Sequence, residues 1–176
     1  LRFLREVIAA VRSATGPAMA VGLRISIGEQ ADEGLTVDES LAALAALAPD
    51  HSLDYVSIVA GTSATLSGSD HIVPPMTMES GYTVPLAARV KAVIDVPVIV
   101  AGRINQPQDA ERFLVAGDAD AVVMTRALIC DPDMPTKAAA GDLEDIRACI
   151  GCNQACIGHF HAGYPISCIQ HPETGR

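Results

Sequence analysis

Short apolar strands alternate with helices along this chain, and this alternation limits the fold more than any other feature. We expect strands at residues 20–26, 54–59, 96–101 and 120–124, and helices at 37–48, 84–94, 107–116 and 132–140. The strands consist largely of Val, Ile and Ala, which is typical of parallel strands covered on both faces. The sequence therefore predicts an α/β fold, either a doubly wound sheet or part of a (β/α)8 TIM barrel. Four strands match half of a barrel, because a complete one takes about 250 residues.

Two helices near the start have clear sequence signals. Thr36 and Glu39 form a capping box at the start of the helix that follows the first strand, and Pro49 ends that helix. An earlier amphipathic helix is indicated by an apolar stripe at helical spacing, formed by Leu1, Leu4, Val7, Ile8 and Val11. Because the stripe already begins at the first residue, which is not Met, we expect the chain to be a piece of a longer protein.

The composition predicts one soluble domain with an aliphatic core. Of the 176 residues, 49% are hydrophobic but only 3% are aromatic. The formal net charge of −9 would repel a nucleic-acid backbone or an anionic membrane surface, so we expect neither as a partner. No apolar run approaches the roughly 20 residues of a membrane span, and no secretory leader is recognisable. We therefore expect a cytoplasmic location.

The connection between the second strand and the next helix, residues 60–83, is long and rich in Gly, Ser and Pro. Long βα connections often carry function. This one contains His71 and Tyr82, and it would lie over the carboxyl ends of the strands. We interpret it as either a lid that faces the substrate or an ordinary surface excursion.

Two consecutive strands end in small residues followed by an arginine, namely Gly102-Arg103 and Thr125-Arg126. In (β/α)8 enzymes the loops after the last two strands commonly bind phosphate through backbone N–H groups. A glycine permits close approach, and arginines add charge and paired donors. The pattern predicts an anion site, although a single arginine of this kind is commonly an ordinary surface residue.

Arg24 interrupts an otherwise apolar strand. Burying an unpaired guanidinium is costly, so this side chain needs a carboxylate partner or a position at the mouth of the barrel. Both a buried ion pair and a fixed positive charge beside a cofactor fit the sequence.

Four cysteines near the end of the chain follow the pattern C-x2-C-x3-C-x11-C: Cys149, Cys152, Cys156 and Cys168. Four thiolates within twenty residues suit a soft metal centre, and a 4Fe–4S cluster needs four such ligands. A structural zinc site is the first alternative, although it usually uses two paired knuckles. Disulfides or free thiols are the second, although nothing here indicates an oxidising compartment.

These motifs, in this order, resemble the old yellow enzyme-type NADH:flavin oxidoreductases. The resemblance is to their iron–sulfur branch, which includes 2,4-dienoyl-CoA reductase, trimethylamine dehydrogenase and related N-demethylases. It runs through RFLREVIAAVR, VGLRIS, LDYVSIVAG, VPVIVAGRINQP, GDADAVVMTRALICDPD and DIRACIGCNQAC. The resemblance implies that residues 1–148 are the C-terminal half, strands five to eight, of an FMN-binding TIM barrel. Residues 149–176 would then be an iron–sulfur segment and the start of a linker to a dinucleotide-binding domain.

The resemblance also implies a role for each site residue. Arg24 would contact the flavin ring and stabilise the negative charge of the reduced form, and His71 would be an active-site histidine. The FMN phosphate would be held by Gly102, Arg103, Thr125 and Arg126. The 4Fe–4S cluster would be bound by Cys149, Cys152, Cys156 and Cys168. In the full-length protein, FAD and NAD(P)H are implied as further cofactors.

We therefore expect an oxidoreductase with hydride transfer at FMN and a single-electron relay through the cluster. Its substrate would be a small molecule, either an N-methyl amine that is demethylated or an activated C=C bond that is reduced. The expected partners are NAD(P)H or an electron-transfer protein, and further copies of the chain in a homo-oligomer. Alone, half a barrel should be inactive. The alternative is a non-catalytic, zinc-binding interaction module.

Overall fold

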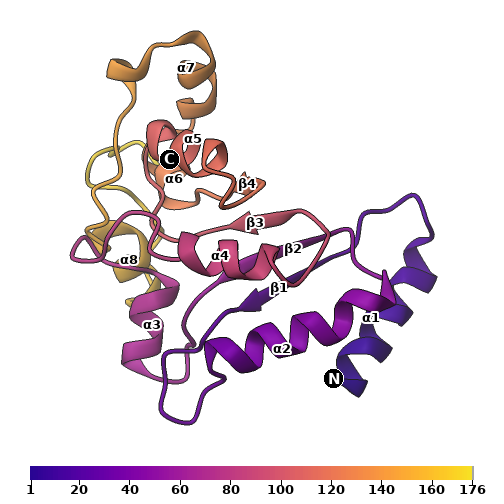
Figure 1. The fold of residues 1–176 in the computed structure, drawn as a ribbon. Helices are drawn as coiled ribbons and strands as arrows, with labels where there is room; N and C mark the ends of the chain where they lie inside the picture. Colours follow the sequence, from indigo (N-terminus) through magenta and orange to yellow (C-terminus); the bar gives the residue numbers. More distant parts are fainter. Residues whose placement is uncertain (176) are drawn as a thin grey trace.

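Four parallel strands form a single sheet in the computed structural model, which describes residues 1–175 (Figure 1). The strands are β1 (Gly22–Ser26), β2 (Tyr55–Val59), β3 (Val98–Val100) and β4 (Ala121–Val122), and they lie side by side in chain order. All three pairings are parallel. Each half of a doubly wound sheet has only three strands in sequence before the order reverses, whereas barrel strands follow chain order all round. The topology therefore agrees with a partial TIM barrel.

The longer helices lie before and between the strands as expected. They are α1 (Arg2–Thr15), α2 (Val37–Leu47), α4 (Val84–Lys91) and α5 (Pro107–Val115). The predicted capping box is confirmed: Thr36 accepts from the backbone N–H of Glu39, whose side chain accepts from the Thr36 N–H. The 3₁₀ turn η1 (Ala48–Asp50), which contains Pro49, follows α2. Shorter helical pieces complete the fold: α3 (Leu66–Ile72), α6 (Arg126–Cys130), α7 (Met134–Ala140), η2 (Leu143–Asp145), the π-helical turn η3 (Gln154–Gly158) and α8 (His159–His161).

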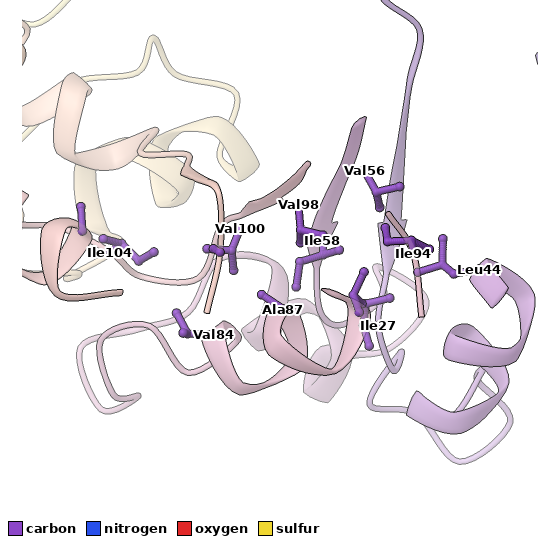
Figure 2. Close-up of a cluster of buried hydrophobic side chains, with 13 residues drawn as sticks. Ile27, Leu44, Val56, Ile58, Val84, Ala87, Ile94, Val98, Val100 and Ile104 are labelled. Atoms are coloured by element: carbon purple, nitrogen blue, oxygen red, sulfur yellow. The ribbon is translucent and has the colours of Figure 1, made fainter. Parts of the chain in front are cut away.

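The core lies between the sheet and the helices α2 and α4 (Figure 2). Its strand residues belong to β2 and β3, and they are fully buried: Val56, Ile58, Val98 and Val100. Leu44 of α2 and Ala87 of α4 pack against them. The opposite face of the sheet, along the register row Arg24, Ser57, Ile99 and Ala121, is less completely covered, with Arg24 exposed. The expectation of burial on both faces is met on the helix side alone, because within residues 1–175 the sheet does not close.

An aspartate anchors the amino end of two strands in the same way. Asp54, just before β2, accepts from the Val21 N–H (2.7 Å) and pairs with Arg12 of α1 (2.7 Å). Asp120, just before β4, accepts from the Val98 N–H (2.8 Å) and pairs with Lys91 of α4 (2.6 Å). Each carboxylate thus fixes a neighbouring strand and a covering helix at once, at the end of the sheet opposite the carboxyl ends.

These two anchors predict a loss of stability in acid. The Val21 N–H and Arg12 lower the pKa of Asp54, and Lys91 and the Val98 N–H lower the pKa of Asp120, both below the ordinary 3.8. A carboxyl whose pKa is lowered by folding stabilises the fold above its ordinary pKa and loses that effect as pH falls through the folded value. In the complete protein, Asp54→Asn/Asp120→Asn should therefore lower the free energy of unfolding at pH 7, and this loss should shrink as pH falls below 3.8. Urea unfolding over a series of pH values measures this, and a loss that is the same at every pH would contradict it.

The connection 60–83, for which the sequence predicts no helix, contains the helix α3. Thr65 caps α3 by accepting from the Gly68 N–H at 2.9 Å. At the other end, the Tyr82 hydroxyl donates to the His71 carbonyl. In Figure 1, α3 lies on the same side of the molecule as α8, and residues of both line one open groove.

The cysteine segment is attached to the carboxyl-end loops and to α6. Asn105, which follows β3, donates to the Cys149 carbonyl at 2.9 Å. Thr174 donates to the Ile129 carbonyl of α6 at 2.9 Å. The backbone of Cys168 forms an isolated antiparallel β-bridge with that of His171.

None of the helices among residues 1–175 is both long enough and apolar enough to span a membrane.

Candidate cofactor site

One cavity at the carboxyl ends of the strands brings together all the residues predicted to bind flavin. Its walls contain Arg24 of β1, the loops after β3 and β4 and part of α3, and so include Gly102, Arg103, Thr125, Arg126 and His71. The cavity has an empty volume of about 520 Å³, part of which is open to solvent. Residues up to 102 positions apart in the sequence thus share one site, since Arg24 and Arg126 both line it.

Arg103 is held in an unusual conformation that points to a ligand. Its backbone φ is +55°, a left-handed value uncommon for residues other than glycine. Ser80 fixes this turn by donating to the Arg103 carbonyl at 3.0 Å. The Nε atom of Arg103 is buried without a hydrogen-bond partner among the described residues. A buried, unpaired guanidinium N–H is costly. A Cβ added to Gly151 would lie 3.3 Å from this Nε, so the atom lies beside the cysteine segment. Arg103 also lines the cavity, where an arginine can pair with an anion.

Gly102 forms a wall that has no room for a side chain. A Cβ added there would lie 1.9 Å from Oγ1 of Thr83, which is fully buried and donates to the Ala101 carbonyl at 2.9 Å. The glycine therefore allows the β3 strand end and the start of α4 to approach closely, whereas the predicted close approach of an anion at Gly102 stays a prediction.

Replacing Gly102 by Ala should destabilise the complete protein by about 1–3 kcal/mol, the usual cost of overpacking a tight site. Urea unfolding measures the change. The second substitution Thr83→Ala removes the nearest clashing atom, so the double variant should lose less than the sum of the two single losses. Strict additivity would show that Thr83 does not oppose the new methyl group.

His71 and Tyr82 form a pair at the edge of the cavity. Their rings meet edge to face with centroids 5.8 Å apart, and His71 Nδ1 lies 2.9 Å from the Ser67 carbonyl. Burial raises the pKa of Tyr82 to about 12, so its hydroxyl remains a donor at neutral pH. The predicted histidine therefore lies in the same cavity as the predicted phosphate residues, and its role stays a prediction.

Arg24 lies on the sheet face opposite the core and lines the cavity. The side chain is exposed, and it takes part in none of the ion pairs found among residues 1–175. Within residues 1–175 Arg24 therefore has no carboxylate partner, and its role beside a cofactor stays a prediction. It needs no such partner there, because this face of the sheet is the open one, where a guanidinium keeps its hydration.

The four predicted metal ligands line a second cavity, next to the first. Its walls contain Cys149, Cys152, Cys156 and Cys168. They also contain Arg126, which lines the first cavity as well; that cavity is named the flavin cavity for its predicted ligand. All five cysteines of the chain are free thiols, so the disulfide interpretation is wrong. Burial raises the pKa of Cys149. Among the described residues, His, Cys, Asp and Glu side chains form no converged group of three or more that would hold a metal ion, so the cluster stays a prediction.

The fifth cysteine, Cys130, lies outside the predicted ligand set. It is fully buried at the end of α6, as expected for a small core residue. Burial, and then the neighbouring Cys168, raise its pKa to about 12. Cys130 is therefore the natural control for any test of the ligand set.

Two asparagines belong to the site although the sequence did not identify them. Asn105 lines the flavin cavity and holds the Cys149 carbonyl. Asn153, between the second and third cysteines, has φ +58° and contacts Arg126. A signal for Asn153 existed, because Asn is the residue after Gly that most readily adopts this conformation in a tight loop.

The comparisons with known proteins agree with this geometry. The sequence profile of the NADH:flavin oxidoreductase / NADH oxidase family matches residues 1–145. The N,N-dimethylglycine/sarcosine dehydrogenase of Chromohalobacter salexigens is 36% identical over all of this chain and 25% of its own length. The metal reductase of Desulforamulus reducens is 34% identical over all of this chain and 26% of its own length.

Among solved structures, a 2-naphthoyl-CoA reductase complex aligns with a TM-score of 0.89 at 28% identity. The alignment covers 99% of this chain and 26% of the reductase, so it extends beyond residue 145 into the cysteine segment. The chain spans about a quarter of the length of these relatives. From the profile match and the shared fold together, the chain belongs to the NADH:flavin oxidoreductase / NADH oxidase family.

Proposed function

We propose that this chain is the FMN-phosphate-binding and iron–sulfur part of an oxidoreductase, and that it forms strands five to eight of the TIM barrel. One observation carries the flavin proposal: Arg24, Gly102, Arg103, Thr125 and Arg126, which come from three separate stretches of the sequence, line one cavity. Family membership supports FMN as the ligand and NAD(P)H as the electron donor.

Each of the cavity residues would have its own role in binding FMN. Arg103 would pair with the phosphate beside the strand end at Gly102. Arg24, further along the cavity on β1, would place a positive charge beside the ring. His71, on α3, would face the substrate side. When bound, FMN supplies hydride chemistry that amino-acid side chains lack.

The cysteine cavity would hold a 4Fe–4S cluster. The donor set fits, because four free thiols from one short segment line the same cavity. Arg126 in the shared wall would contribute a fixed positive charge between the two sites. FAD and NAD(P)H would bind in parts of the complete protein beyond this segment, and the cytoplasmic location stays a prediction.

For the substrate, we propose an N-methyl amine, with an activated C=C bond as the second candidate. The amine is supported by the 36% identity to a dehydrogenase named for dimethylglycine and sarcosine. The activated C=C bond is supported by the close structural match to a naphthoyl-CoA reductase.

The test uses the complete protein, purified without oxygen. Metal and flavin analysis should find about four irons and one FMN per chain, in line with a 4Fe–4S centre. One colourless zinc and no flavin would instead support a zinc-binding interaction module. Steady-state assays with dimethylglycine and with an enoyl thioester then separate the substrates. Activity with neither would contradict both substrate proposals.

A further inference from the structure

The flavin cavity and the cysteine cavity share one side chain, Arg126, and its hydrogen bonds join them physically. Arg126, the first residue of α6, lines both cavities. Its Nη1 donates to the Pro74 carbonyl at 2.8 Å and to Oδ1 of Asn153 at 2.5 Å. A guanidinium has five N–H groups, so the Nε and Nη2 groups lie outside these two hydrogen bonds. The same side chain can therefore meet an anion in the flavin cavity while it holds the cysteine loop.

Asn153 is the partner of Arg126 within the cysteine loop. It lies directly after Cys152, and its left-handed φ of +58° turns the chain into η3, where Cys156 lies. Its side-chain amide makes two hydrogen bonds, one as acceptor and one as donor. Oδ1 accepts from Arg126, and Nδ2 donates to the Val73 carbonyl at 2.8 Å. Val73 and Pro74 are adjacent residues just after α3. Arg126, Asn153 and this short stretch thus form one junction between α6, the cysteine loop and the α3 segment.

The junction links the order of the loop to the position of the arginine. An anion in the flavin cavity would fix Arg126, and a fixed Arg126 holds the Asn153 amide more firmly between its two partners. Ligands at the cysteines would fix the loop and so fix Arg126 from the other side. When two ligands stabilise the same arrangement, each increases the affinity of the other by the same factor.

We propose that Asn153 is a positioning residue that couples the two cofactor sites, so that FMN slows the loss of the cluster and the cluster tightens FMN binding. This proposal rests on the proposed function. In the complete protein we expect the cluster to tighten FMN binding about tenfold, which is within the usual range for coupled sites, and FMN to slow the release of iron.

The test variant is Asn153→Gly, because glycine keeps the left-handed backbone and removes only the amide. The matched control is Gln154→Ala, which changes the adjacent, exposed residue. Two quantities are measured in the complete protein: the FMN dissociation constant, by fluorescence, with and without the cluster, and the rate of iron release to a chelator, with and without FMN. Asn153→Gly should abolish both effects, so that FMN binds equally well with and without the cluster and iron is released equally fast with and without FMN, whereas Gln154→Ala should keep both effects as in the wild type.

A second measurement needs no variant. Adding FMN to the iron-free wild-type protein should slow amide hydrogen exchange in residues 151–158, as expected if the flavin site orders the loop. Full coupling in Asn153→Gly, or unchanged exchange in the wild type, would overturn the coupling while FMN and iron still bind. If the wild type binds neither FMN nor iron, the proposed function fails and the coupling fails with it.

Discussion

Replacing Cys168 by Ala should remove most of the iron from the complete protein. A 4Fe–4S cluster needs four thiolate ligands, and Cys168 is the one that comes from outside the loop of the other three. It lies in the turn that bridges to His171 and is held against α6 through Thr174. Iron per chain and visible absorbance measure the loss, which should be from about four irons to well below one.

Cys130→Ala is the control, because Cys130 is fully buried next to Cys168 but lies outside the predicted set. It should retain the iron. The reverse result, with iron lost from Cys130→Ala and kept in Cys168→Ala, would show that Cys130 is the fourth ligand. Full iron in both variants would show that the cluster is bound elsewhere.

Replacing Arg103 by Asn should weaken FMN binding by about 100-fold. Asparagine tolerates the φ of +55° at this position, so the backbone should survive the change. The variant loses a guanidinium whose buried Nε has no protein partner in the described structure. Two charge-assisted hydrogen bonds to a phosphate, at about 1.5 kcal/mol each, correspond to a factor of this size. Quenching of flavin fluorescence gives the dissociation constant.

The matched control is Arg89→Asn, which makes the same chemical change on the surface of α4. Arg89 pairs with Asp38, and neither residue lines the flavin cavity. The affinity of this variant for FMN should equal that of the wild type. An unchanged affinity in Arg103→Asn would instead place the phosphate away from the β3 strand end.

The fold was predictable where local signals and burial agree. The capping box at Thr36 fixes the start of α2, and the apolar runs locate all four strands. The strands are shorter than predicted, and β4 retains only two residues, because apolar composition does not show where the ladder of hydrogen bonds ends. By contrast, α3 consists of LSGSDHI, which has little helix propensity. Tertiary contacts such as the one from Tyr82 to the end of α3 hold it in place, and no local pattern encodes them.

The charged residues of the site could be predicted from the sequence, but the hydrogen bonds that join its parts could not. Two arginines after successive strands indicate an anion site, and the structure places both in one cavity. The hydrogen bond from Asn153 to Val73 joins residues 80 positions apart. Such contacts depend on how α3 and the cysteine loop meet in space, so reading the chain locally does not reveal them.

The anchors at Asp54 and Asp120 and the cavity residues lie at opposite ends of the same strands. A substitution in the carboxyl-end loops therefore leaves the carboxylates that join strands to helices untouched. During evolution, a lineage with this architecture is free to exchange the residues that meet its substrate while inheriting the supporting end unchanged. The chemistry of the site can then change while the scaffold is kept, although both depend on the same short stretch of chain.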